Sequence, residues 1–258
     1  MLNIALPSSG PLYQSTIDFF NNAGIPIKRS SLRAYYGTTN FDKNIKIIFQ
    51  RQSDIPNSIS NKVADIGVLG LDRYLENIQG NKTKILIEKL GYGNCDLVVA
   101  VPQSWNDINN MSDLVAYSNT NKLRIATKYP IQTQNYLSAN HMKLHEIIST
   151  NGAVESAPQT GIADIIVDIS STGTTIREND LKILDDGYIL FSEATLISNP
   201  VTLSNYKDKF NSAKKLLYFI LGNMNSKLYN TIIFNIESEN ENQLFKILKS
   251  KNTNFITN

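Results

Sequence analysis

Small hydroxyl-bearing residues run from Ser170 to Thr175, and this segment is the part of the sequence best able to bind an anion. The apolar stretch 164–169 before it predicts a buried strand, with Asp168 near its carboxyl end. Gly173 would let the backbone curl so that successive N–H groups converge, and a helix starting at Thr174 would add the positive end of its dipole. The segment therefore predicts a phosphate cradle without lysine, beside a carboxylate that suits the hydroxyls of a ribose or a metal ion bridging them.

The same residues also have an ordinary structural interpretation, which is a Thr-Gly turn after a strand with an acidic end. A bare Thr-Gly-Thr-Thr would favour that interpretation. The longer pattern favours the phosphate site, because Glu155, Gly161, Ala163 and Asp168 precede the loop at fixed separations.

Short runs rich in Ile and Val alternate with helical patterns, which indicates β-α units and a largely parallel sheet. The predicted strands are residues 3–6, 45–49, 65–69, 84–89, 95–101, 123–127, 145–148 and 164–169. Residues 188–198 are expected to form one extended stretch and residues 203–225 one helix. Other helices are expected to begin at Pro11, with Ser9 as cap, and at Ile55-Pro56, with Asp54 as cap.

Two extended stretches, residues 96–101 and 190–197, could cross between two domains. The predicted first domain holds residues 1–98 and 186–226, and the second holds residues 99–185 with the hydroxyl-rich loop. Residues 227–258 read as a small β-α-β tail. The predicted fold class is α/β, with two domains of periplasmic-binding-protein-like type around a central cleft that holds the ligand.

Composition narrows the functional classes. Of 258 residues, 41% are hydrophobic and 19% charged, and the net charge of +2 is spread along the chain, which favours neither a nucleic-acid nor a membrane partner. No apolar run approaches the ~20 residues that span a bilayer, and the N-terminus lacks a secretory pattern. Cys95 is the one cysteine, so we expect a reducing compartment and a cytoplasmic protein.

The histidines and the cysteine suggest no further chemistry. His141 and His145 are four residues apart, as in a helical zinc pair, but His145 is predicted to enter a strand and no cysteine completes a site. Cys95 lies in an apolar strand without an adjacent basic residue, so it is interpreted as packing.

From Glu155 to Thr175 the sequence resembles the signature of the ATP phosphoribosyltransferase family, with Ile176 where the family usually carries Leu or Met. Further similar segments follow in order along residues 1–200. They are Arg51-Gln-Ser-Asp54-Ile55-Pro56, Ala64-Asp65-Ile66-Gly67 with Gly70-Leu71-Asp72, Leu90-Gly91-Tyr92-Gly93 with Cys95, and Arg124-Ile125-Ala126-Thr127 with Tyr129-Pro130.

The resemblance implies the enzyme that opens histidine biosynthesis, in which N1 of ATP attacks C1 of phosphoribosyl pyrophosphate with inversion and pyrophosphate departs. It implies that the 5-phosphate is held by Ser171, Thr172, Gly173, Thr174 and Thr175. Asp168 and Glu155 would act at the ribose as catalytic residues, and ATP or pyrophosphate would meet Gly10, Arg51, Asp72 and Tyr92. Mg²⁺ would neutralise the departing pyrophosphate, with Asp168 the residue that could touch it. A homo-oligomer and a separate regulatory subunit are further implied partners.

Three of these residues have plainer interpretations. Arg51 could form a surface ion pair with Asp54, Asp72 could cap a helix, and Tyr92 could be packing. The sequence also departs from the family in the turn at residues 8–12, where many members carry Lys and Arg but this chain has neither. Lys28, Arg29, Arg33 or Lys128 could compensate. A small-molecule binding protein without catalysis, built on the same two domains, is therefore the alternative function.

Overall fold

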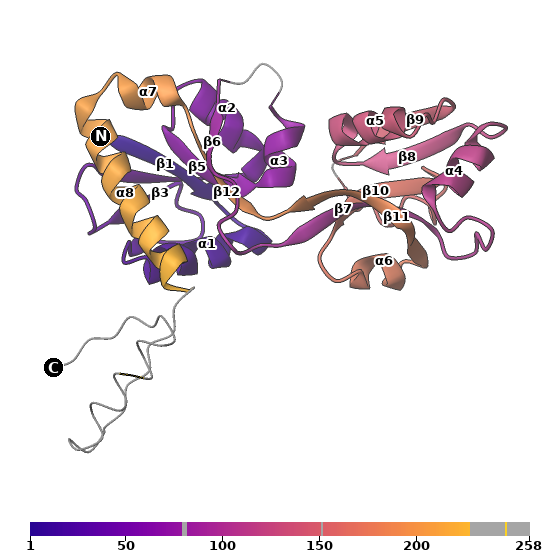
Figure 1. The fold of residues 1–258 in the computed structure, drawn as a ribbon, viewed down its shortest axis with the longest axis horizontal. Helices are drawn as coiled ribbons and strands as arrows, with labels where there is room; N and C mark the ends of the chain where they lie inside the picture. The colour runs from indigo at the N-terminus through magenta and orange to yellow at the C-terminus, as the bar shows by residue number, and fades with distance from the viewer. Residues whose placement is uncertain (79–81, 151, 228–245, 247–258) are drawn as a thin grey trace. The chain divides into compact units, whose positions relative to one another are not determined.

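The computed structural model describes residues 1–78, 82–150, 152–227 and 246. The chain divides into a unit of residues 1–224 and a unit of residues 225–258, and the first contains two sheets (Figure 1). The predicted tail, residues 227–258, lies outside the described residues except for Lys227 and Lys246. Within the described ranges, no helix is long and apolar enough to cross a membrane.

The first sheet has seven strands in the order β2-β3-β4-β1-β5-β12-β6. Their bounds are β1 Leu2–Pro7, β2 Ile27–Arg29, β3 Tyr36–Thr39, β4 Ile45–Gln50, β5 Ile66–Gly70, β6 Lys84–Ile87 and β12 Ala194–Ser198. Strand β1 lies parallel to both β4 and β5, so the carboxyl ends of these three strands meet at one edge. The turns that follow Pro7, Gln50 and Gly70 are thereby brought together.

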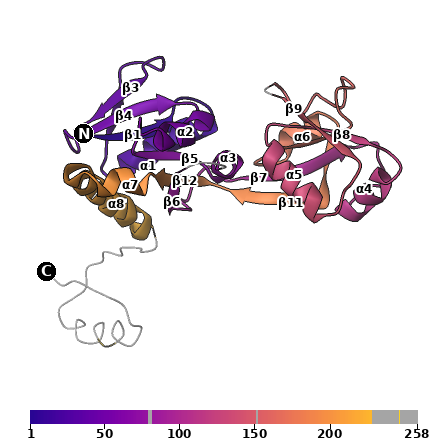
Figure 2. The same cartoon turned by 90° about the horizontal axis from the view of Figure 1, so that it is seen from above.

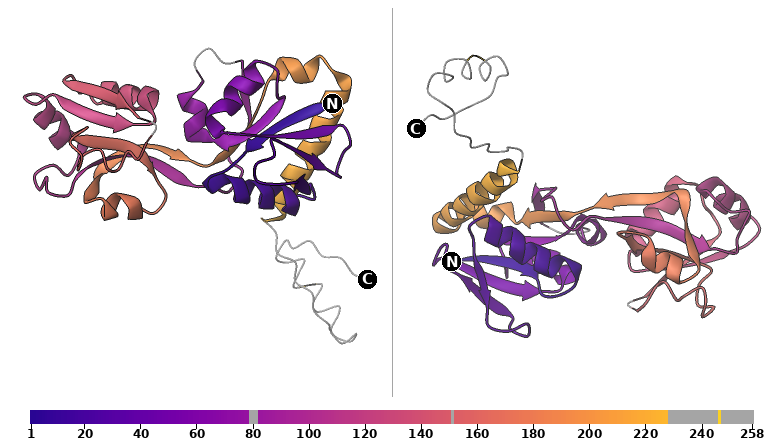
Figure 3. Two further views of the ribbon diagram at one scale, coloured as in Figure 1. Left: turned by 180° about the vertical axis from the view of Figure 1, so that it is seen from behind. Right: turned by 90° about the horizontal axis from the view of Figure 1, so that it is seen from below.

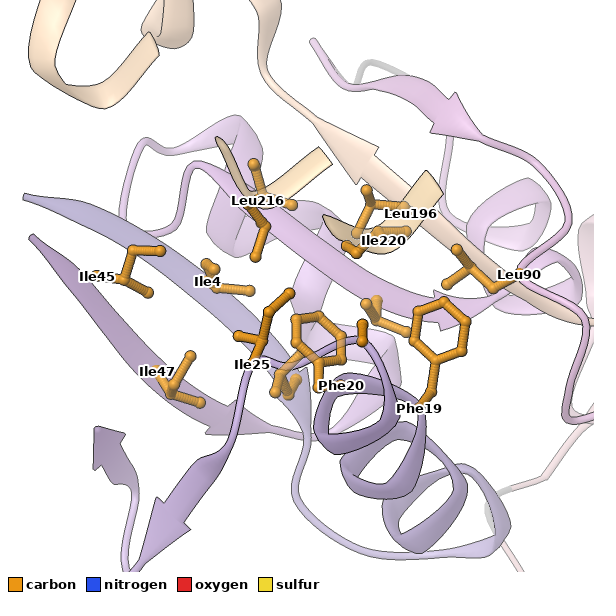
Figure 4. Close-up of a cluster of buried hydrophobic side chains, with 14 of the residues drawn as sticks. Ile4, Phe19, Phe20, Ile25, Ile45, Ile47, Leu90, Leu196, Leu216 and Ile220 are labelled. Atoms are coloured by element: carbon orange, nitrogen blue, oxygen red, sulfur yellow. The ribbon is translucent and has the colours of Figure 1, made fainter. Parts of the chain in front are cut away.

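Helices cover both faces of this sheet (Figure 2). They are α1 Pro11–Asn22, the 3-10 turn η1 Gln52–Asp54, α2 Ile55–Ser60, α3 Leu71–Glu76, α7 Pro200–Ser204 and α8 Lys207–Ser226. On one face, α1 and α8 pack on the strands, and Figure 4 shows Phe20 of α1 in one cluster with Leu216 and Ile220 of α8. On the other face, α2 and α3 cover Ala5 and Ile197.

The second sheet has five strands in the order β11-β7-β10-β8-β9. Their bounds are β7 Cys95–Pro102, β8 Leu123–Thr127, β9 His145–Ser149, β10 Ile165–Ser170 and β11 Leu181–Ser192. Its helices are α4 Met111–Ser118, α5 Pro130–Ala139 and α6 Thr174–Glu178. Helices α4 and α5 pack on one face and α6 on the other, as Figure 3 shows from behind and below.

The predicted single stretch 188–198 is two strands in different sheets. Strand β11 ends at Ser192 and β12 begins at Ala194, so Glu193 alone lies between them. The stretch is extended as predicted, and it passes from one sheet to the other without a turn residue at the change of sheet. Strand β7 begins the second sheet at Cys95 and pairs antiparallel with β11.

The prediction of a single helix over residues 203–225 is wrong, because the structure has two helices with a break at Asn205-Tyr206. The first helix starts earlier, at Pro200, where the Asn199 side chain accepts hydrogen bonds from the N–H groups of Val201 and Thr202. Asn205 then ends it, and the long helix begins at Lys207.

Two predicted helix caps are not formed in the part of the chain described. Gly10, and not Ser9, occupies the N-cap position of α1, with a φ of 81° that suits glycine. Asp54 already has helical dihedral angles, because η1 runs directly into α2, and its side chain makes no capping hydrogen bond.

A buried ion pair fastens α8 to the start of β5. The Lys209 Nζ lies 2.8 and 3.0 Å from the two carboxylate oxygens of Asp65, whose side chain is 1% exposed. We expect Asp65→Ala to lower the free energy of unfolding by about 3–5 kcal/mol, because it leaves the Lys209 charge without its partner. Urea denaturation would measure this loss.

A matched control is the exposed pair Lys122–Glu146, for which Glu146→Ala should cost less than about 1 kcal/mol. The double variant Asp65→Ala with Lys209→Met should recover part of the loss. Equal losses in the buried and the exposed pair would contradict the prediction.

Candidate functional site

The hydroxyl-rich loop forms the predicted strand–turn–helix. It leaves β10 at Ser170, whose hydroxyl accepts a hydrogen bond from the N–H of Gly173 at 2.9 Å. Gly173 has a φ of 71° and is the N-cap residue of α6. A hydrogen bond of 2.9 Å joins the hydroxyls of Thr172 and Thr174, and both residues are exposed. The backbone N–H groups of the first turn of α6 and these hydroxyls together supply donors for an anion.

Asp168 lies before this loop with its side chain almost fully buried. The residue is 4% exposed, and its carboxylate accepts from the N–H of Ile169 at 2.9 Å. Burial raises the pKa of Asp168, while the Lys128 ammonium, 3.8 Å from the carboxylate, acts to lower it. Glu155 is near enough to raise the pKa further. The two predicted catalytic acids therefore interact electrostatically.

Arg73 is a cation of this region that the sequence alone did not single out. Its guanidinium lies over the Tyr129 ring at 4.3 Å, and its Nε is 3.9 Å from the Asp72 carboxylate. Its charge also acts to lower the pKa of Asp168. Its position directly after Gly70-Leu71-Asp72 was the available signal, but nothing in the sequence indicates a partner 95 residues away.

Asp72 is occupied by protein side chains. It accepts a hydrogen bond from the Tyr129 hydroxyl at 2.6 Å and another from the Ser192 hydroxyl at 2.7 Å. Burial raises the pKa of Tyr129 above its ordinary range, with the Asp72 charge as a second cause. Asp72 is the second residue of α3, and its contacts join that helix to elements of the second sheet. Both oxygens of this carboxylate thus already accept a hydrogen bond from the protein.

Glu76, a second residue that the sequence alone did not single out, caps a helix from a distance. Its carboxylate accepts from the N–H groups of Ile131 and Gln132 at 2.8 and 3.0 Å, in the first turn of α5. Burial raises the pKa of Glu76. One helix of the first sheet thus carries Asp72, Arg73 and Glu76, and all three contact the β8–α5 turn or α5 itself.

The remaining predicted residues lie along the first sheet. Gly10 and Arg51 are exposed in the turns after β1 and β4, which neighbour each other. In the described structure no ion pair joins Arg51 to Asp54. Tyr92 donates its hydroxyl to Thr16 at 3.1 Å and packs its ring on Phe19, and burial raises its pKa. These contacts fit the packing interpretation of Tyr92.

Arg29 reaches the turn after β1, which lacks the usual cations. It donates to the carbonyls of Ser8, Leu32 and Ala34 and lies over the rings of Tyr13 and Phe49. The Arg29 guanidinium is therefore used to hold the turn by hydrogen bonds. Lys128 is the cation that lies beside Asp168.

His145 and Cys95 make their polar contacts with other residues of the protein. His145 begins β9 and contacts the Met142 carbonyl and the Gln134 amide oxygen. Burial raises the pKa of Cys95 to about 11, which disfavours a thiolate. Among the residues that the structure describes, no three metal-ligating side chains gather as a metal site.

A buried acid at the end of a strand, followed by a donor-rich turn and a helix, is the anion-binding arrangement of α/β proteins that hold sugar phosphates. A model of the ATP phosphoribosyltransferase family matches residues 51–218. The chain is 39% identical to an ATP phosphoribosyltransferase of Chelativorans sp. strain BNC1 over 206 residues, or 76% of this chain and 89% of that one. The chain belongs to the ATP phosphoribosyltransferase family.

Two further comparisons extend this finding. An ATP phosphoribosyltransferase of Bradyrhizobium sp. strain ORS 278 is 37% identical over 206 residues, which span 77% of this chain but 63% of that one. The solved structure of the ATP phosphoribosyl transferase (HisG:HisZ) complex from Thermotoga maritima shares the fold with a TM-score of 0.69 and 28% identity, covering 88% of this chain and 99% of that one.

Proposed function

We propose that this protein transfers the phosphoribosyl group of phosphoribosyl pyrophosphate to N1 of ATP, the first step of histidine biosynthesis. Family membership gives the reaction, and the arrangement of Asp168 directly before the Ser170–Thr175 loop carries the assignment to this site. This arrangement provides donors for a terminal phosphate and an acceptor for the ribose hydroxyls.

The residues would work mainly by position and charge. The loop from Ser171 to Thr175 fixes the 5-phosphate, and Asp168 accepts from the 2- and 3-hydroxyls. The bond between C1 and the pyrophosphate oxygen breaks as the bond from N1 of ATP forms on the opposite side of C1. Positive charge that develops on the ribose is stabilised by the carboxylates of Asp168 and Glu155. Lys128 and Arg73 would attract the departing anion.

Magnesium fits this proposal as part of the sugar donor, whose pyrophosphate oxygens supply most of its ligands. Asp168 is the carboxylate best placed to touch the ion, and its partner Lys128 is only 3.8 Å away. The bound ion would neutralise the leaving pyrophosphate, while the chain itself holds the ribose and the 5-phosphate.

A regulatory partner subunit is part of the same proposal. The structurally similar Thermotoga maritima protein was solved as a HisG:HisZ complex, and the likeness covers 88% of this chain. A homo-oligomer remains a prediction, which light scattering of the purified protein would test.

The direct test mixes protein, ATP, phosphoribosyl pyrophosphate, Mg²⁺ and pyrophosphatase, and follows the formation of phosphoribosyl-ATP. We expect product in proportion to enzyme concentration, since pyrophosphatase removes the product that drives the reverse reaction. A parallel reaction with a candidate regulatory subunit shows whether the chain needs one. Nucleotide binding without product in either mixture would support the alternative, a binding protein without catalysis.

A further inference from the structure

Two aromatic rings on β11 are exposed and stacked on each other. Phe191 is 73% exposed and Tyr188 is 43% exposed, and their ring planes lie 10° apart with centroids separated by 6.0 Å. Residues three apart in a regular strand point to opposite faces. Here the pairing of β11 with β7 shifts register between Tyr188 and Leu190. The irregularity therefore brings both rings to one face of the sheet.

This face also carries the phosphate-binding loop. Ser192, which follows Phe191, directs its hydroxyl toward Asp72, so Phe191 points to the other side of the strand. Phe191 is paired across the ladder with Asp96, and Asp96 is paired with Ser170. Directly paired residues project from the same face. Phe191, Asp96 and Ser170 therefore form a row across β11, β7 and β10.

The row has dimensions that suit a nucleotide beside the sugar donor. Neighbouring strands are about 4.8 Å apart, so the backbones of Phe191 and Ser170 are separated by about 10 Å. Ser170 holds the N–H of Gly173, which fixes the loop. Asp96, between the two, is half-buried and presents a carboxylate.

We propose that Phe191, supported by Tyr188, stacks against the purine ring of the nucleotide substrate, and that Asp96 accepts a hydrogen bond from the exocyclic amino group of that ring. This inference rests on the proposed function, which requires a purine next to C1 of the ribose. Adenine N6 and N1 are neighbours on one edge of the ring. With N6 bonded to Asp96, the ring can present N1 to the loop side of the row, where the ribose would lie.

The first test replaces Phe191 by leucine and measures the KM values for both substrates and the direct binding of ATP by calorimetry. We expect the KM and the dissociation constant for ATP to rise about 5- to 100-fold, the range of base–aromatic stacking. The KM for phosphoribosyl pyrophosphate should change less than about two-fold, because the loop is intact. Phe210→Leu, the same change at an exposed ring on α8, should leave all values as in the wild type.

The second test compares ATP with inosine triphosphate, which carries a carbonyl in place of the amino group. The wild type should bind ATP about ten-fold more tightly, because Asp96 repels that carbonyl. Asp96→Asn should bring the two nucleotides to within about two-fold, since an amide both donates and accepts.

The outcomes separate this inference from the proposed function. Unchanged ATP binding in Phe191→Leu overturns the stacking surface, even if the wild type makes product. Weaker ATP binding in Phe191→Leu supports the stacking surface, even if the wild type makes no product. A change in oligomeric state on light scattering, with equal weakening of both substrates, would show that the rings form a subunit interface and would overturn the inference.

Discussion

Replacing Asp168 by asparagine is expected to lower kcat/KM by about 10²- to 10³-fold, as for loss of a charged group that stabilises a transition state. Its buried carboxylate lies before the loop, where the ribose of the sugar donor would be held. Asparagine keeps the size of the side chain but removes the charge that would stabilise an oxocarbenium-like ribose. Initial rates at varied phosphoribosyl pyrophosphate measure the effect.

The matched control is Asp185→Asn, which removes an exposed carboxylate from the same sheet and should leave kcat/KM unchanged. Similar rates in both variants would show that Asp168 has no catalytic part and that the site is elsewhere.

The pH dependence follows from the direction of the Asp168 pKa shift. Burial raises this pKa above the ordinary value of about 3.9, so the acidic limb of kcat/KM should lie at higher pH than for an exposed aspartate. Because the folded-state pKa exceeds the unfolded one, ionisation of this group lowers stability as pH rises through the folded-state pKa. Asp168→Asn should therefore be no less stable than the wild type at neutral pH.

Replacing Gly173 by valine is expected to lower kcat by about 100-fold or more and to raise the KM for phosphoribosyl pyrophosphate. Gly173 has a φ of 71°, which a β-branched residue rarely adopts, and an added Cβ would lie 2.7 Å from the Arg177 guanidinium. The loop must then change shape, and its N–H groups no longer converge. Steady-state kinetics, together with circular dichroism of the fold, would measure this.

Gly24→Val provides the control, because Gly24 also has a positive φ, of 75°, but lies in the first sheet's α1–β2 turn. It should lower stability without changing the KM for the sugar donor. Gly173→Asn should keep more activity than the valine variant, since asparagine tolerates a left-handed backbone. Full activity in Gly173→Val would contradict the role of the loop.

Most strands and the turn between β10 and α6 could be predicted because they depend on local features. Runs of Ile and Val marked most strands, and Ser170, Gly173 and Thr174 are sufficient to specify a strand–turn–helix. The short strands β2 and β3 were missed, because Lys28, Arg29 and Gly37 give them no apolar alternation.

The rest of the site depends on contacts between residues distant in the sequence. Asp72 was expected to meet a ligand, yet Tyr129 and Ser192 occupy it, 57 and 120 positions away. Glu76 caps a helix 55 residues later. The local sequence around an acidic residue is the same whether its carboxylate binds a substrate or a distant N–H group. These partners could therefore not be predicted.

Side chains of the protein cap the N-termini of α4 and α5, which restricts where a polyphosphate could bind. Asn110 and Asp113 close a capping box at α4, and Glu76 fills the amino end of α5. The N–H groups of both helices are bonded to acceptors of the same chain. These acceptors have a high effective concentration, with which a free nucleotide competes poorly. Among the described helices of the second sheet, α6 is the one whose amino end has no side-chain cap. Under the proposed function, a phosphate would therefore meet uncapped N–H groups at α6 and capped ones at α4 and α5.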